Sequence, residues 1–283
     1  MMFRLSARGY VALVMPSPCP SNFSQFDSKN KVMEETVIKY RTKKPRLKNP
    51  IFIEGLSGVG DVGRLAAEYL IRKLHGKKLA DVYSQFFAMP PLLIPGVKYE
   101  QGVAELLKDE LFYDEKSNLI ILTGYYQGYR PENYYKYADT LLDLCAEFSV
   151  SRIFTLGGYT TGRYLKNPGV YVIATSDELV EEMRRYGLKV GSSGNVFGIT
   201  GVLLGLGKER GFEVICLLGE THGAYPDPKG AKVVLEKLVE IIGIELDLKE
   251  IKAESDKLDE EFERYMAERL KTERKKEEFS YIG

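Results

Sequence analysis

The sequence predicts an α/β fold, a three-layer sandwich with a largely parallel central sheet and a C-terminal helical extension. Two observations predict it. Apolar runs such as NLIILTG and FEVICLLG are nearly continuous, which is typical of strands that are covered on both faces. Between these runs lie helical segments of about a dozen residues, the alternation expected of βαβ units. The chain has 283 residues, 44% of them hydrophobic, so it can bury a sizeable core.

Composition excludes several classes of protein. Lys and Arg together number 40, as do Asp and Glu, so the net charge is zero and a basic nucleic-acid surface is not expected. Attraction to anionic membranes is not expected either, and no apolar run approaches the ~20 residues of a membrane-spanning helix. The scattered Cys19, Cys145 and Cys216 suit a reducing cytoplasm. With His75 and His222 as the only histidines, a histidine-rich site is excluded, and we expect no metal.

Three segments divide the chain. Residues 1–35 combine a short apolar run with PSPCPSNFSQ, which is turn and loop chemistry, and predict a disordered leader. A signal peptide would need a longer apolar region and a small-residue cleavage site. Met33 is a candidate for the biological start. The α/β domain is expected at 36–247, and a charged helical extension at 248–283.

The first elements form a strand–helix–strand unit. Alternating apolar and charged residues predict an edge strand at 35–45. An apolar strand at 51–56 leads through a glycine turn into a helix at 64–76, which ends at Gly76. β-Branched and aromatic residues predict the next strand at 79–87.

The middle of the domain begins with a proline-broken loop at 89–96, followed by a strand and a turn within 103–118. A core strand at 118–127 precedes a helix at 131–150, which has a proline at its start and apolar residues at helical spacing. An apolar strand at 151–159 ends at a glycine pair.

The last part of the domain continues the alternation. An acidic first turn and arginines in the last turn mark a helix at 177–187. Apolar runs and glycines place the other elements. These are a strand at 169–176, a glycine-rich helix at 196–211, a strand at 212–220, a loop at 220–228 and a helix at 229–243.

The extension at 248–283 is mostly charged but carries an apolar stripe at roughly helical spacing. The stripe comprises Ile251, Leu258, Phe262, Tyr265 and Leu270. One interpretation packs this helix on its own domain, and the other lets it protrude to contact another subunit or protein. The chain ends in FSYIG, and a tail that merely solvates would not need Phe279, Tyr281 and Ile282.

A glycine-rich turn, GLSGVGDVG, joins a strand to a helix and contains Gly55, Gly58, Gly60 and Gly63. The last three fit G-x-G-x-x-G, the dinucleotide fingerprint. That site also needs an acidic residue about 20 positions on, at the end of the next strand, and Asp81 stands before that strand instead. We expect a close-packed strand-to-helix crossover, no nucleotide cofactor, and at most a stray anion at the helix N-terminus.

A second glycine motif, TLGGYTTGR, follows an apolar strand. We expect Gly157, Gly158 and Gly162 to form a tight turn that lets a helix or a neighbouring subunit approach closely. In the alternative, the backbone N–H groups of this turn bind an anion and Arg163 pairs with a phosphate.

The loop LLGETHGAYPDP holds an acid/base pair, Glu220 and His222, which at i and i+2 could face one pocket. A histidine held by a carboxylate suits general acid–base chemistry. No nucleophile elbow accompanies it, and Cys216 is expected to pack in the core. A local hydrogen-bond feature is the simpler interpretation, and a hydrolase or phosphorylase-like enzyme is the alternative.

The stretch GYYQGYRPENYYKY, residues 124–137, is rich in tyrosine. Tyrosine has a wide apolar face and a polar tip, which suits protein interfaces. Stacking on single-stranded RNA would want more basic residues than Arg130 and Lys136. A protein interface is therefore the better interpretation.

Taken together, the motifs resemble the proteasome assembly chaperone family in its archaeal branch. The resemblance rests on GLSGVGDVGRLAAEYLI, TLGGYTTG, GITGVLLGLG and ICLLGETHGAYPDP, which in order and spacing cover about residues 50–247. It implies an α/β domain like that of nucleoside phosphorylases, without an established catalytic site or cofactor. It also implies closed homo-oligomers, tetramers or pentamers, that assist the 20S proteasome core.

Members of this family that act on the proteasome end in a hydrophobic-Tyr-any tripeptide, whose carboxylate can meet a lysine between α-subunits. This chain departs from that pattern, because it ends Ser280-Tyr281-Ile282-Gly283. One extra residue moves the carboxylate by ~3.3 Å in an extended chain. The resemblance still makes the C-terminal segment the expected partner-binding element, for the proteasome or another cytoplasmic protein. Its residues are Leu258, Phe262, Tyr265, Phe279, Tyr281, Ile282 and Gly283.

Overall fold

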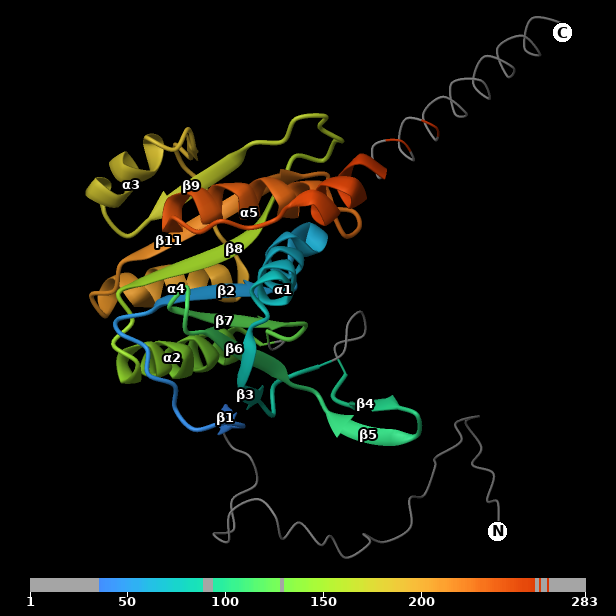
Figure 1. Ribbon diagram of the computed structural model, residues 1–283, viewed down its shortest axis with the longest axis vertical. Helices are drawn as coiled ribbons and strands as arrows, with labels where there is room; N and C mark the ends of the chain where they lie inside the picture. Colours follow the sequence, from blue (N-terminus) through green and yellow to red (C-terminus); the bar gives the residue numbers. More distant parts are fainter. Residues whose placement is uncertain (1–35, 89–93, 128–129, 258–259, 261–263, 265–283) are drawn as a thin grey trace, which may run out of the picture. The chain divides into compact units, whose positions relative to one another are not determined.

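The computed structural model describes residues 36–88, 94–127, 130–257, 260 and 264 (Figure 1). The predictions for the leader at 1–35 and for Met33 lie outside these residues. The same is true of the C-terminal residues Leu258, Phe262, Tyr265, Leu270, Phe279, Tyr281, Ile282 and Gly283.

A nine-stranded sheet runs through the described domain in the order β1-β3-β6-β7-β2-β8-β11-β9-β10. Its strands are β1 (Val37–Tyr40), β2 (Ile51–Leu56), β3 (Lys77–Tyr83), β6 (Asp109–Asp114), β7 (Leu119–Gly124), β8 (Arg152–Thr160), β9 (Val170–Ala174), β10 (Lys189–Val190) and β11 (Val214–Thr221). A separate hairpin is made of β4 (Val97–Glu100) and β5 (Val103–Leu106).

The centre of the large sheet is parallel, since β7, β2, β8 and β11 all run in one direction. On one side β6, β3 and β1 continue with antiparallel pairing. On the other side β9 is antiparallel to β11 and parallel to β10. The predicted α/β class is confirmed. The continuous apolar runs identified the centre correctly because every residue of β7 and β11 is buried, as covered strands require.

Helices cover both faces of the sheet (Figure 1). They are α1 (Val62–Leu74), α2 (Pro131–Glu147), α3 (Asp177–Arg184), α4 (Gly198–Glu209) and α5 (Pro228–Ile242), with a short 3-10 helix η1 (Val59–Asp61) before α1. Apolar residues of α2 and α4, such as Leu141 and Leu203, pack on one face. Residues of α1, α3 and α5, such as Leu70 and Leu238, pack on the other. The result is the expected three-layer sandwich.

Glycines let α1 and α5 lie directly on the strands. A Cβ at Gly55 would lie 2.5 Å from the Cβ of Ala67, and one at Gly63 would overlap the carbonyl group of Leu156. A Cβ at Gly219 would lie 2.6 Å from the carbonyl oxygen of Gly230. At these positions any larger residue would push helix and strand apart.

The hairpin is the main element that the sequence did not predict, since β4 follows the expected loop at 89–96. Its turn residues Gln101 and Gly102 have φ of 48° and 82°. Two central residues with positive φ make the turn that best matches the twist of a hairpin. A glutamine before the glycine gives a weaker signal than the usual asparagine or aspartate, so the turn was missed.

The first residues of the C-terminal extension pack on the domain. Residues 249–257 are helical, and Ile251 is 2% exposed within the apolar core beneath α1. The hydroxyl of Tyr69 donates to the carbonyl oxygen of Asp247 at 2.9 Å, and Glu250 pairs with Arg72 and Lys73. Among the described helices, none is long and apolar enough to cross a bilayer.

Candidate binding surface at the carboxyl edge of the sheet

The motifs singled out in the sequence meet at one edge of the sheet. The parallel strands β2, β8 and β11 end there, and they lead into the Gly58 turn, the Thr161 loop and the His222 loop. In parallel sheets this is the edge at which ligands commonly bind. The contacts of each motif therefore decide what the edge can do.

The Gly58 turn is wedged between β8 and the loop after β11. Gly60 has φ of 63°, and a Cβ there would lie 2.7 Å from Oγ1 of Thr221. A Cβ at Gly158 would overlap the carbonyl oxygen of Val59. The backbone N–H of Asp227 donates to the carbonyl oxygen of Gly60 at 2.8 Å. The turn thus packs against protein on two sides.

The topology does not match a dinucleotide site. The strand after α1 is β3, which is separated from β2 by β7 and β6, whereas the fingerprint belongs to a βαβ unit. The placement of Asp81 before that strand was wrong, because Asp81 lies within β3 and is 2% exposed. Burial opposes its ionisation, but Lys78 and Arg41 hold the pKa of Asp81 below its ordinary value.

The N-terminus of α1 is occupied by a carboxylate of the chain itself. Asp61 accepts a hydrogen bond from the hydroxyl of Ser57 at 2.5 Å and pairs with Arg64 at 2.8 Å. A carboxylate at this position has the sign that the helix dipole favours. Asp61 therefore places a carboxylate beside the helix N-terminus, where it is neutralised by Arg64 and caps no backbone N–H group.

The glycine pair of the second motif lies inside a strand. Gly157 and Gly158 belong to β8 and pair with Leu218 and Gly219 of β11, so the predicted tight turn at the pair was wrong. The element that approaches Gly158 closely is the short 3-10 helix η1, through the carbonyl oxygen of Val59. The backbone is extended at Gly157 and Gly158 because the pairing between β8 and β11 continues through both residues.

Glu220 is held by the segments beside it. Its Oε2 accepts from the backbone N–H of Gly169 at 2.7 Å and from Nζ of Lys189 at 2.9 Å. Burial alone would raise its pKa, but Lys189 and the Gly169 N–H hold the pKa of Glu220 below its ordinary value. Glu220 is thus an ionised anchor for the start of β9.

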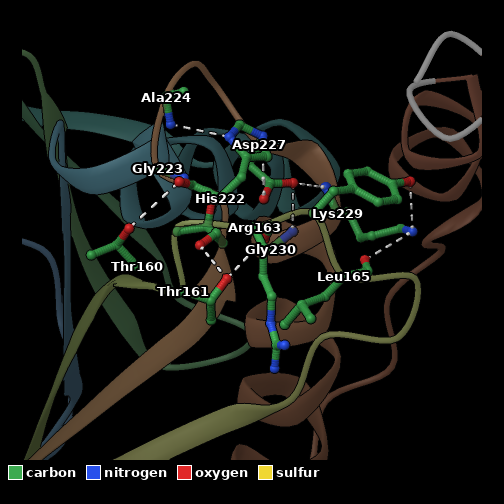
Figure 2. A network of polar contacts seen from close by, with 12 residues as sticks. Thr160, Thr161, Arg163, Leu165, His222, Gly223, Ala224, Asp227, Lys229 and Gly230 are labelled. Atoms are coloured by element: carbon green, nitrogen blue, oxygen red, sulfur yellow. Dashed lines mark hydrogen bonds and ion pairs between the residues drawn. The ribbon is translucent and has the colours of Figure 1, made fainter. Parts of the chain in front are cut away.

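His222 has other partners than Glu220 (Figure 2). Its Nδ1 accepts from the backbone N–H of Ala224 at 3.0 Å, and its Nε2 lies 3.8 Å from Oδ2 of Asp227. The ring packs on Tyr225, with centroids 3.9 Å apart. The two residues expected to face one pocket therefore have different partners, Glu220 beside β9 and β10 and His222 within the loop that follows β11.

Asp227 and Lys229 join this loop to the loop between β8 and β9 (Figure 2). Asp227 caps α5 by accepting from the backbone N–H groups of Lys229 and Gly230, each at 3.0 Å. Nζ of Lys229 reaches the hydroxyl of Tyr164 at 3.1 Å and the carbonyl oxygen of Lys166 at 2.8 Å. Burial lowers the pKa of Lys229. These contacts fix the shape of the edge.

Two buried acids beneath α2 and α4 were missed by sequence reasoning. Glu54 accepts from the backbone N–H of Leu56 at 3.0 Å and from the hydroxyl of Thr200 at 3.1 Å, and burial raises its pKa to about 7. Asp109 accepts from the hydroxyl of Tyr137 at 2.8 Å, and burial raises its pKa well above the ordinary value. The available signal was a glutamate inside the apolar run IFIEGL.

Comparison with known proteins identifies the family. The model of the PAC2 family matches residues 52–266. The chain belongs to the PAC2 family. An uncharacterized protein of Methanocaldococcus jannaschii, MJ1210, is 31% identical over 260 residues, which cover 87% of this chain and 99% of that protein.

This PAC2 domain is similar in structure to two archaeal proteins. Pyrococcus furiosus PbaB, an archaeal proteasome activator, is 34% identical with a TM-score of 0.75, covering 83% of this chain and 100% of that one. Pyrococcus furiosus PbaA, an archaeal homologue of proteasome-assembly chaperone, is 27% identical with a TM-score of 0.69, covering 88% and 98%. The expected resemblance to the archaeal branch is confirmed.

The PAC2 domain exposes aromatic and apolar side chains around the carboxyl edge. Val59, Tyr125, Tyr159 and Tyr225 are each about two-fifths exposed, and Phe197 before α4 is 82% exposed. The tyrosine-rich stretch is divided, since Tyr126 and Tyr137 are buried in the core while Tyr125 and Tyr135 reach the surface. Exposed aromatic side chains of this kind suit contact with protein.

Two further features bear on chemistry. Burial raises the pKa of the Cys216 thiol to about 12 and also raises that of Cys145, so neither cysteine is a reactive thiolate at neutral pH. Within the described residues, no group of three or more His, Cys, Asp or Glu side chains is arranged to hold a metal ion.

Proposed function

We propose that this PAC2 protein is a non-catalytic, homo-oligomeric chaperone or scaffold that acts on the proteasome core. The observation that carries the proposal is the likeness to PbaB, which extends over the whole of that chain. PbaB is an archaeal proteasome activator, and PbaA is related to proteasome-assembly chaperones. A cytoplasmic location and a protein partner follow from this role.

The contacts at the carboxyl edge support binding in preference to turnover. Glu220 is neutralised by Lys189, Asp61 by Arg64, and the ring of His222 is stacked on Tyr225. General acid–base chemistry needs a base within hydrogen-bond reach of a substrate proton, with its partner orienting it. Because Glu220 and His222 contact different partners, these contacts favour binding over the hydrolase or phosphorylase-like alternative.

We assign partner binding to the C-terminal segment. Residues 249–257 are fixed on α1 by Ile251 and by the pairs of Glu250, so the rest of the extension starts from a defined place beside the core. The tail brings Phe279, Tyr281, Ile282 and Gly283. Leu258, Phe262 and Tyr265 provide the apolar stripe between the two.

A truncation after Lys257 tests this assignment while keeping the residues that pack on α1. Binding of the full chain, of chain 1–257 and of Tyr281→Ala to archaeal 20S core particles would be measured by analytical ultracentrifugation, with Ser280→Ala as the matched control. Truncation and Tyr281→Ala should weaken binding at least tenfold with an unchanged melting temperature, and Ser280→Ala should not. Equal binding by all four chains would reject the C-terminal assignment.

A further inference from the structure

The hairpin β4–β5 has an apolar face that its own described domain leaves open. Val97 pairs with Leu106 and Tyr99 pairs with Ala104, so these side chains share one face of the hairpin. Tyr99 is 80% exposed, and Val97 and Leu106 are 47% and 42% exposed. The opposite face carries Lys98, Glu100, Val103 and Glu105.

The hairpin meets its domain through the polar face. Nζ of Lys98 lies 4.3 Å from the ring centroid of Tyr125, which directly follows β7. A sheet with one wet face normally buries the apolar face on its own core. Here every residue of β4 and β5 is exposed, so neither face is buried on the described part of the domain, and an isolated two-stranded hairpin is at best marginally stable in water. The apolar face therefore needs cover from outside the domain.

The same chain carries a groove of suitable chemistry along α4. It has a volume of about 500 Å³, and its walls include Tyr135, Phe197 and Leu206. Its lining includes Gly198, Gly201 and Gly205, and at Gly205 no atom lies within 4 Å of where a Cβ would stand. Glu209 is the single charged residue among those that line it. The groove can thus receive an apolar ridge without stripping water from several charges.

We propose that the apolar face of the hairpin of one copy docks in the α4 groove of the next copy, and that the repeated contact closes a ring. This inference rests on the homo-oligomer proposed above. The hairpin and α4 lie in different parts of the domain (Figure 1), so the contact joins two copies. Because the two surfaces differ, the contact is heterologous, and heterologous contacts form rings when the rotation closes.

The size of the contact favours a ring over a dimer. The two hairpin strands have eight residues and nine residues line the groove, whereas a standard stable interface uses ~20–30 residues and ~800 Å² a side. A single contact of this size is weak. In a ring every copy makes two such contacts, and the last one forms within an assembled complex at high effective concentration.

Charge substitutions on the two faces of the hairpin form a matched test. Tyr99→Glu places a carboxylate on the apolar face, and Val103→Glu places one on the opposite face, where the side chain is 68% exposed. Native mass spectrometry over a dilution series of each full chain would give the apparent dissociation constant. Tyr99→Glu should raise it at least tenfold and Val103→Glu less than threefold. An oligomer that Tyr99→Glu leaves intact would overturn the docking.

Cysteine cross-linking identifies the two surfaces directly. In a Cys19→Ser background, Cys145 and Cys216 remain buried, and Tyr99→Cys and Gly205→Cys would be made as separate full chains. Mixed and reassembled copies should form a disulfide-linked dimer on mild oxidation, while each variant alone should form none. Cross-linking of Tyr99→Cys alone would show that hairpins meet each other and would reject the groove. A monomeric wild-type chain would reject the homo-oligomer itself.

Discussion

Replacing Glu54 by Gln should change how the stability of the domain depends on pH. Glu54 is fully buried, with two hydrogen-bond donors and no cation among its described contacts. Burial raises its pKa to about 7 from an ordinary value of 4.5. A group with a raised folded pKa contributes most to stability below its unfolded pKa, and this contribution is lost as the pH rises through the folded value.

The size of the effect follows from the two pKa values. Each pH unit between 4.5 and about 7 is worth 1.36 kcal/mol, so ionisation of Glu54 removes about 3 kcal/mol of unfolding free energy between pH 4.5 and pH 8. Glutamine has a similar shape and no charge to bury. Asp109 also has a raised pKa and contributes in the same direction, so part of the slope remains in the variant.

Guanidinium unfolding of both chains at pH 4, 5, 6, 7 and 8, at one protein concentration, measures the effect. Below pH 5 the variant should be equal to or slightly less stable than the wild type. At pH 8 it should be more stable by about 2–3 kcal/mol. A stability difference that stays constant over this range would show that Glu54 does not titrate as described, and the reasoning from burial would be refuted.

Three further substitutions test the packing of the domain. Gly63→Ala should cost about 1–3 kcal/mol in unfolding free energy, because its Cβ would overlap the carbonyl group of Leu156. Gly58→Ala is the control and should cost far less, since the nearest atom to its Cβ lies at 3.9 Å. Equal losses in the two variants would contradict the close approach of α1. Ile251→Ala should lower the unfolding free energy by about 2–5 kcal/mol, which thermal unfolding would measure. An unchanged stability would mean that residues 249–257 do not pack on the core in solution. Asp227→Ala removes the cap of α5 and should cost about 1 kcal/mol, and Asp227→Asn should recover most of it; no rescue would contradict the capping role.

The sequence was sufficient for the class of fold and for most elements. Strands such as β7 and β11 are covered on both faces, so their composition is itself the signal of their place. The order of the strands could not be predicted from the sequence, because β3 follows β2 and α1 along the chain but pairs with β1 and β6 instead of β2. The hairpin was missed because its turn has glutamine where asparagine or aspartate is usual before the glycine, and because its strands have only four residues each.

The candidate site was predicted only in part. The glycine motifs were recognised and do meet at one edge, since the parallel strands that precede them end together. The partners of Glu220 and His222 could not be read from a spacing of two, because Lys189 begins β10, Gly169 precedes β9 and Asp227 stands at the far end of the loop that holds His222. Glu54 was overlooked because a lone acid in an apolar run gives no hint of its partners, and Asp109 because it stands between the charged residues Lys108 and Glu110.

The central claim is that this PAC2 protein is a homo-oligomer that binds the proteasome core. Native mass spectrometry of the full chain, alone and with 20S core particles of its source organism, tests it most directly. The expected result is a closed oligomer alone and, in the mixture, core particles whose mass is raised by that oligomer. A monomer alone, with core particles of unchanged mass in the mixture, would contradict the claim.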